Sequence, residues 1–314
     1  MLSRLILVIN PRSSGFKLVK TKILSHLNEA DFAQTEIITF EIQPTNPMSN
    51  AQEMASGLRD GDTILVAGGD GTAHIATNAA AISGKKDLKI KYTGFGNFND
   101  YANSFSKNSG AEAVRAIKKQ AVKSKVKPIE LRVNGEFFRY APLYATVGLT
   151  AEMAEIFEGK RLRKALKKVP GRNSRLALSL LAATRFYFKH RANHLLKIAN
   201  ITTDSENSSA QDQKITDLVF MNGPRMARIM RSRANKLDDE TFGFTALNAG
   251  DFRKNLPFIT KGFFSRIPLR RTKNAKIEFT KPTKIAIQIE GEAMILREVK
   301  TLEAHIAEVE ISVL

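Results

Sequence analysis

The sequence predicts an α/β domain with a parallel sheet, followed by a second, β-rich domain of antiparallel, sandwich-like architecture. Strand-like and helix-like segments alternate through the first 125 residues, and short strand-like runs dominate after them. Such alternation is typical of a parallel sheet covered by helices. We place the first domain at residues 1–125 and the second at residues 126–296. Residues from about 297 to 314 are expected to return to the first domain.

In the first domain, each expected strand is a short apolar run. The expected strands are 5–9, 36–40, 63–67 and 88–92, and the expected helices are 17–29, 50–58, 73–82 and 111–120. Ligands of parallel sheets bind at the carboxyl ends of the strands. Three of these ends carry Asn10-Pro11, Gly68-Gly69 and Thr93-Gly94. A binding site is therefore expected at that edge of the sheet.

The second domain begins with an expected hairpin over residues 129–140, whose tight primed turn is Asn134-Gly135. A helical insertion is expected at about 151–190, and the polar segment 203–214 is expected to be a flexible loop. The further expected strands are 195–202, 215–221, 242–247, 275–279, 284–289 and one or two strands within 304–314.

The composition of the chain excludes some kinds of site and favours some kinds of partner. The chain has 314 residues, 43% of them apolar, and its lack of cysteine excludes disulfides and thiolate metal sites. Its net charge of +18 favours polyanionic partners: nucleic acid, an anionic lipid surface or a phosphorylated ligand. No apolar run approaches the roughly 20 residues that span a bilayer. We therefore expect a cytoplasmic protein whose membrane contact is peripheral.

The strongest local signal is the turn Gly68-Gly69-Asp70-Gly71-Thr72 between an expected strand and an expected helix. Consecutive glycines let backbone N–H groups converge on an anion, and the helix N-terminus adds a partial positive charge. A carboxylate at Asp70 is unsuited to bind phosphate but suited to orient a magnesium shell or a donor group. The turn predicts phosphate binding; an ordinary Asp-Gly turn is the alternative.

Three other segments carry polar groups at strand ends. Small residues and a cation follow the first strand, at Asn10, Pro11, Arg12, Ser13 and Ser14. Glycine, amide and carboxylate groups follow the fourth strand, at Gly96, Asn97 and Asp100. Glu290-Gly291-Glu292 follows the expected strand 284–289, where one carboxylate could accept a hydroxyl proton while the other holds a cation or a donor. Taken alone, each segment is also explained by a loop, a cap or an acidic turn.

The order of these four segments resembles the diacylglycerol kinase catalytic family, the bacterial lipid kinase group that also includes sphingosine kinases. The shared motifs are Asn-Pro-x-Ser, Gly-Gly-Asp-Gly-Thr, Gly-x-x-Asn-Asp-aromatic-Ala and a final x-Gly-Glu, and they span residues 10–292. The resemblance implies a cleft between an α/β nucleotide domain and a β-rich domain. It also implies that ATP phosphates lie on the Gly68 to Thr72 turn and against the Asn10 loop.

The resemblance assigns roles to the candidate residues. Glu292 corresponds to the family's proton acceptor, and the catalytic residues implied are Glu292, Glu290 and Asp70. Magnesium would be held by Asp239 with backbone oxygens of Lys236 and Thr241. The nucleotide-binding residues implied are Asn10, Pro11, Arg12, Ser13, Ser14, Gly68, Gly69, Asp70, Gly71, Thr72, Gly96, Asn97 and Asp100.

The expected function is ATP- and Mg²⁺-dependent phosphorylation of a hydroxyl of diacylglycerol or a related lipid, within phospholipid biosynthesis. The chain departs from the family pattern at Gly94 and Asn97, where proline and threonine are usual, at Glu290, where aspartate is usual, and at Glu240, where glycine is usual. Two alternatives stay open: an NAD kinase-like enzyme for a soluble substrate, and an inactive nucleotide-binding relative.

The expected partner is a lipid substrate at an anionic membrane surface, at the inner face of the membrane. Residues 160–168 form the densest basic cluster, and residues 261–266 and 270–271 could extend it toward an anionic bilayer. No aromatic-basic recognition motif supports a nucleic-acid partner, so none is expected. A homodimer is left open.

Overall fold

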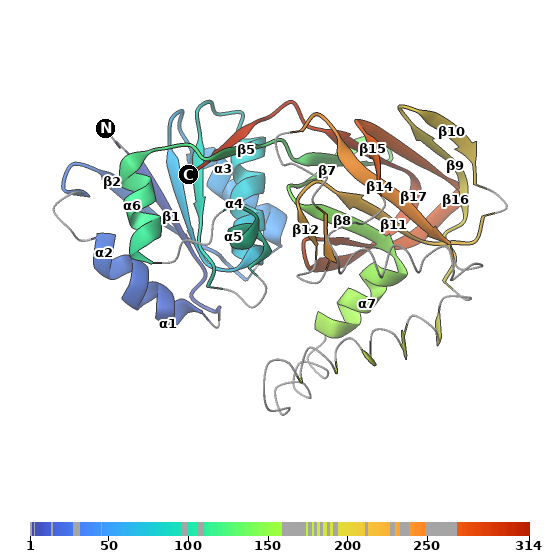
Figure 1. The fold of residues 1–314 in the computed structure, drawn as a ribbon, viewed down its shortest axis with the longest axis horizontal. Coiled ribbons are helices and arrows are strands. Elements are labelled where there is room, and N and C mark those ends of the chain that lie inside the picture. Colours follow the sequence, from blue (N-terminus) through green and yellow to red (C-terminus); the bar gives the residue numbers. More distant parts are fainter. Residues whose placement is uncertain are drawn as a thin grey trace.

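The computed structural model contains two sheets, one in each half of an elongated molecule (Figure 1). It describes residues 2, 4–13, 15–27, 32–44, 46–95, 99–105, 110–158, 174, 178, 181–182, 185–186, 189–190, 194–210, 213–226, 230–232, 239–248 and 269–314.

The first sheet has six strands in the order β2-β1-β3-β4-β18-β5. Its strands are β1 (Arg4–Ile9), β2 (Glu36–Glu41), β3 (Thr63–Ala67), β4 (Lys89–Tyr92), β5 (Ser124–Val126) and β18 (Ile311–Val313). Pairing is parallel throughout except between β18 and β5. All side chains of β1 and β3 are buried, because helices cover both faces of the sheet.

Successive residues of the central strands face opposite helical layers. Ile6 and Val8 pack against α3 (Pro47–Gly57) and α4 (Asp70–Ile82), whereas Leu5 and Leu7 pack against the other layer. That layer consists of α1 (Phe16–Val19), the π-helical turn η1 (Lys20–Leu24), α2 (Ser25–Leu27) and α6 (Ala111–Lys119). In Figure 1, α4 and the short α5 (Asp100–Phe105) lie on the side of the sheet that faces the second half of the molecule.

The second sheet is antiparallel, with the path β15-β14-β11-β8-β16-β17-β6-β7 and the hairpin β9-β10 attached to β16. Its strands are β6 (Ile129–Val133), β7 (Glu136–Ala141), β8 (Tyr144–Gly148), β9 (Ile198–Thr203), β10 (Glu206–Ser209), β11 (Ile215–Met221), β14 (Phe242–Asn248), β15 (Arg270–Thr272), β16 (Asn274–Ile289) and β17 (Glu292–Ile306). A short pair, β12 (Arg225–Met226) and β13 (Met230–Arg231), stands apart, and α7 (Leu149–Glu158) follows β8.

The predicted fold class is confirmed: a mostly parallel sheet with helices precedes an antiparallel, β-rich half. The hairpin over 129–140 is also confirmed, with positive φ angles of 54° at Asn134 and 83° at Gly135. β18 lies in the first sheet, beside β4, whereas β17 belongs to the second. Among the described helices, none is long and apolar enough to cross a membrane.

Two expectations for the second half were wrong. Residues 206–209 of the expected flexible loop form β10, because the polar run closes a hairpin against β9. The expected strands 275–279 and 284–289 are one strand, β16, which shifts register between Glu278 and Ile285. A bulge of this kind bends a strand without ending it. Residues 159–173 of the expected helical insertion lie outside the described residues, as do both basic clusters at 160–168 and 261–266.

Candidate functional site at the junction of the two sheets

The Gly68–Thr72 turn joins the carboxyl end of β3 to α4. Gly69 is the N-cap of α4, with φ −102° and ψ −167°, and the helix begins at Asp70. The first N–H groups of a helix have no partner within the helix, so they are available to an anion. A Cβ at Gly68 would lie 2.5 Å from Thr72 Oγ1, so the turn requires glycine there. A Cβ at Gly71 would meet no atom within 4 Å.

The Asp70 carboxylate connects this turn to α5. Its Oδ1 accepts a hydrogen bond from the Tyr101 backbone N–H at 3.1 Å, and it also accepts from the backbone of Asn99 and Asp100. Burial raises the pKa of Asp70 to about 6. Burial, followed by the charge of Asp70, raises the pKa of Asp100 to about 7. Two neighbouring carboxyl groups therefore titrate close to neutral pH.

The Asn10 loop lies against the loop that follows β4. Asn10 accepts the Ser13 N–H with its backbone oxygen at 3.0 Å and the Arg12 N–H with its side-chain Oδ1 at 3.0 Å. A Cβ at Gly15 would lie 1.9 Å from the Phe95 carbonyl oxygen, so the two loops touch through backbone. Ser13 Oγ is buried and has no hydrogen-bond partner within the described part of the chain. Arg12 is exposed beside it.

The loop after β4 is also tied to the glycine turn. The Phe95 N–H donates to the Gly68 carbonyl at 3.0 Å, and Thr93 Oγ1 donates to the Val66 carbonyl at 2.7 Å. The structure thus brings three of the predicted segments together at one edge of the first sheet. Ser14, Gly96 and Asn97 lie outside the described residues.

Glu290 and Gly291 form the two-residue turn between β16 and β17. Their φ angles are +53° and +93°, and Ile289 pairs with Glu292 across the hairpin. Both angles are positive, as in a primed turn. Positive φ is unfavourable for a glutamate, so other contacts of this residue must hold it there.

Those contacts come from three other elements. Glu290 Oε1 accepts the Leu143 N–H at 2.5 Å, and Oε2 accepts the Tyr101 hydroxyl and lies 3.3 Å from His74 Nδ1. Burial raises the pKa of Glu290 well above its usual value, and burial lowers the pKa of His74 to about 3. Glu290 is thus a buried carboxyl group with a raised pKa that joins the second sheet to α4 and α5.

Glu292 has a different environment although it is only two residues away. Its side chain is 30% exposed, and Oε2 accepts from Arg139 Nη1 at 2.9 Å. The Arg139 side chain is 5% exposed, and its Nε has no hydrogen-bond partner among the described residues. Glu292 therefore keeps access to solvent while a buried guanidinium fixes its position.

Two of the three predicted magnesium ligands, Asp239 and Thr241, are described, and both contact an arginine. Arg271 Nη2 donates to Asp239 Oδ2 at 2.5 Å and to the Thr241 carbonyl at 2.7 Å. Lys236 lies outside the described residues. Within the described ranges, no three His, Asp or Glu residues are grouped so that they could hold a metal ion. A guanidinium thus occupies one carboxylate oxygen of Asp239 and the Thr241 carbonyl, an arrangement that does not fit a magnesium ion on the same two oxygens.

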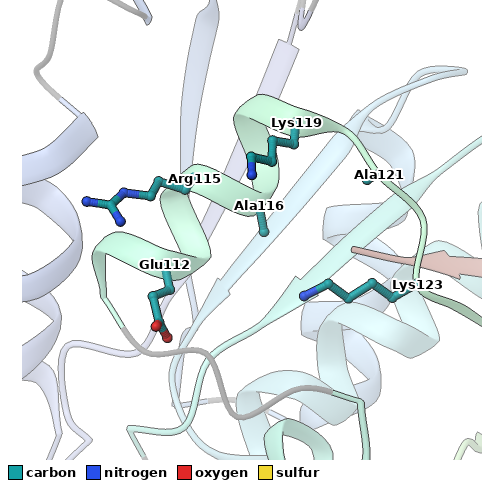
Figure 2. Close-up of a pocket in the computed structure, with 6 residues that line it drawn as sticks. All are labelled: Glu112, Arg115, Ala116, Lys119, Ala121 and Lys123. Atoms are coloured by element: carbon teal, nitrogen blue, oxygen red, sulfur yellow. The ribbon is translucent and has the colours of Figure 1, made fainter.

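A shallow cavity of about 240 Å³ lies elsewhere, on the surface of α6 (Figure 2). Figure 2 shows Lys119 and Lys123 reaching over it from the helix and from the segment that follows. None of its lining residues is a predicted site residue, and α6 covers the face of the sheet opposite to α4. This cavity is therefore separate from the candidate site.

The chain is similar to one protein family and to several solved structures. Residues 4–131 match the family model described as the diacylglycerol kinase catalytic domain. Two solved structures, whose descriptions name a diacylglycerol kinase from Bacillus anthracis str. Sterne, are each 19% identical to this chain. They cover 98% of it and 96% of their own chains, with TM-scores of 0.66 and 0.63. No curated protein matches the chain.

These similarities support a fold class and a resemblance to a protein family. The class is a two-sheet protein in which an α/β half precedes an antiparallel half, as in those solved structures. The match of residues 4–131 to the model of the diacylglycerol kinase catalytic domain agrees with the resemblance inferred from the motifs.

Sequence reasoning missed four side chains that shape the site. His74 and Tyr101 contact Glu290, Arg139 contacts Glu292, and Arg271 contacts Asp239. Tyr101 is the aromatic residue of the Gly-x-x-Asn-Asp-aromatic-Ala motif, which gives no sign of its contact with Glu290. The other three stand 32 to 216 positions from their partners and carry no local signal.

Proposed function

We propose that this protein is an ATP-dependent kinase that phosphorylates a hydroxyl of diacylglycerol or a related lipid. One observation carries the proposal: within a chain that resembles this family, the buried Glu290 holds the Glu292 turn against α4 and α5, whose N-termini form the glycine-turn site. The proposed phosphate site and the partly exposed Glu292 carboxylate thereby belong to elements on the two sides of one junction. This is the arrangement that transfer to a hydroxyl requires.

The residues at the first sheet fit a nucleotide phosphate chain. The α4 N-terminus offers backbone N–H groups, Gly71 leaves open space in front of them, and Ser13 Oγ is a buried donor without a partner in the described part of the chain. Arg12 adds an exposed cation at the same loop. When bound, ATP supplies the γ-phosphoryl group. These protein groups orient its phosphates and spread their charge.

Asp70 and Asp100 are suited to a magnesium ion that accompanies the nucleotide. The charge of Asp70 raises the pKa of Asp100, and burial raises both pKa values toward neutral. A divalent cation between the two carboxylates would relieve their repulsion and favour the ionised forms. We therefore assign the nucleotide-associated magnesium to these two residues and not to Asp239.

Glu292 is the proposed general base. Its carboxylate accepts the proton of the lipid hydroxyl while the hydroxyl oxygen forms its bond to the γ-phosphorus and the bond from the γ-phosphorus to the bridging oxygen of the leaving ADP breaks. Arg139 holds the carboxylate in position. Glu290 is assigned a positioning role, because its side chain is 1% exposed and contacts protein groups on both oxygens.

We place the enzyme in the cytoplasm, at the inner face of an anionic membrane, where its lipid substrate lies. The net charge of +18 supports this placement, since basic side chains near an anionic surface contribute about 1 kcal/mol each.

The test is a transfer assay with γ-radiolabelled ATP, magnesium and diacylglycerol in mixed micelles that contain phosphatidylglycerol. Label is expected in phosphatidic acid, and its appearance should require both magnesium and the anionic lipid. A panel of other lipid alcohols would define the acceptor. Absence of transfer to every lipid, together with phosphorylation of NAD, would replace the proposal with an NAD kinase-like function.

A further inference from the structure

The segment before β14 is held to the edge strand β15 by one side chain. Arg271 lies on β15 opposite Gly243 of β14. Its guanidinium extends toward residues 239–241, which precede β14. Nη2 contacts Asp239 Oδ2 at 2.5 Å, the Thr241 carbonyl at 2.7 Å and Thr241 Oγ1 at 2.7 Å, and Nε donates to the same hydroxyl at 3.0 Å. Arg271 thus satisfies a carboxylate, a carbonyl and a hydroxyl together.

These three acceptors are oxygen groups that a hard divalent cation would use. A magnesium ion needs a near-octahedral shell of oxygens at about 2.0–2.1 Å. It cannot approach Asp239 Oδ2 and the Thr241 carbonyl while a guanidinium donates to both. The like charges of the two cations would also repel each other at this distance. Arginine and a metal ion are therefore mutually exclusive here.

Glu240, the acidic residue next to Asp239, is also paired with a cation. Lys127, in the connection between β5 and β6, forms an ion pair with Glu240. The segment 239–241 is thus held by two cations from two different elements, β15 and the β5–β6 connection. Its charge is balanced by protein side chains on both sides.

We propose that Arg271 is a built-in cation that takes the place of a divalent metal at Asp239, so that this part of the chain is organised without a bound ion. The inference rests on the proposed function only for the choice of magnesium as the competing ion. Its test needs neither ATP nor lipid, so the proposed function can fail while this inference stands, and the reverse.

The experiment measures thermal unfolding of the full chain and binding of Mn²⁺, both without nucleotide. Any difference in Tm between EDTA and millimolar magnesium is expected to be the same in the wild-type protein and in Asp239→Asn. The number of Mn²⁺ ions bound, counted by electron paramagnetic resonance, is expected to be the same in the wild type and in Asp239→Asn. Arg271→Ala should lower the Tm by about 3–6 °C.

Arg270→Ala is the matched control. Arg270 is the neighbouring cation on β15, and it pairs with Glu206 where both side chains are about half exposed. Because exposed pairs contribute little, its loss should lower the Tm by no more than about 2 °C. The proposal is overturned if magnesium raises the wild-type Tm and Asp239→Asn abolishes that rise, if Asp239→Asn loses a bound Mn²⁺, or if the two arginine variants are equally stable.

Discussion

The Gly68–Thr72 turn and the Glu290–Glu292 turn stand on the two sides of the junction and are built in opposite ways. The first is shaped by backbone: Gly68 has no room for a side chain, and Gly69 caps the helix with an extended conformation. The second is shaped by side chains, because Glu290 keeps its positive φ through contacts with Leu143, His74 and Tyr101.

The two turns therefore suit different steps: the first suits phosphate binding, and the second suits proton transfer. A backbone turn presents N–H groups whose positions are fixed by the strand and the helix, which suits a phosphate of constant shape. A side-chain turn places two carboxyl groups in unequal environments: Glu290 is buried and has a raised pKa, and Glu292 is partly exposed and paired with Arg139. If this division is right, variants of the two turns should change different measurements.

Glu292→Gln should have the largest effect. Glutamine cannot accept the hydroxyl proton, and general bases contribute about 10²–10⁴-fold, so kcat for the lipid is expected to fall by about 10³-fold. Steady-state kinetics with diacylglycerol would measure this. The Tm should stay within about 2 °C of the wild type, because the side chain is partly exposed. A variant that keeps more than about a tenth of the wild-type kcat would show that another group takes the proton.

Glu290→Ala should mainly reduce stability. It leaves the Leu143 N–H and the Tyr101 hydroxyl unsatisfied in a buried place, at a cost of about 2–3 kcal/mol in the free energy of unfolding. Urea denaturation would measure it.

Glu290→Gln is the matched control for that variant. Glutamine keeps the shape of the side chain and an acceptor oxygen but has no charged form. Because burial raises the pKa of Glu290 on folding, the wild type loses stability as the pH rises above the ordinary pKa of a glutamate, so Gln should become more stable relative to Glu as the pH rises. A Gln variant as unstable as the Ala variant would mean that Glu290 is ionised in the fold.

The same contrast explains how much could be predicted from sequence. The four strands and the glycine turn of the first half were predicted because their signals are local: apolar runs, consecutive glycines and a helix start. The environment of Glu290 was not predicted, because His74 lies 216 positions away and only the fold brings the two together. Arg271 was missed for the same reason, since its contact with Asp239 depends on the pairing of β14 with β15.

Gly71→Ala tests the backbone turn with a smaller expected effect. The added methyl meets no protein atom, so the Tm should stay within about 2 °C of the wild type, but it enters the space in front of the α4 N-terminus. The KM for ATP should therefore rise about 10-fold with little change in kcat. Gly57→Ala, which also has open space around its Cβ, is the control and should leave KM unchanged. Equal kinetics in both variants would place the phosphates away from this turn.

Asp100→Asn should have the smallest effect and depends on pH. The pKa of Asp100 is about 7 in the folded protein, whereas its ordinary value, expected in the unfolded chain, is 3.8. Between these values the folded state binds more protons than the unfolded state, so Asp100 lowers stability progressively as the pH rises from about 4 to about 7. Asparagine removes that penalty. The variant should be more stable than the wild type by about 1–2 kcal/mol near pH 8 and equal to it near pH 4 in urea denaturation.

The Asp100→Asn variant should also bind magnesium–ATP more weakly, because half of the proposed carboxylate pair is lost. A stability difference that is the same at both pH values would mean that Asp100 is not held at a raised pKa, and the proposed pairing with Asp70 would lose its electrostatic support.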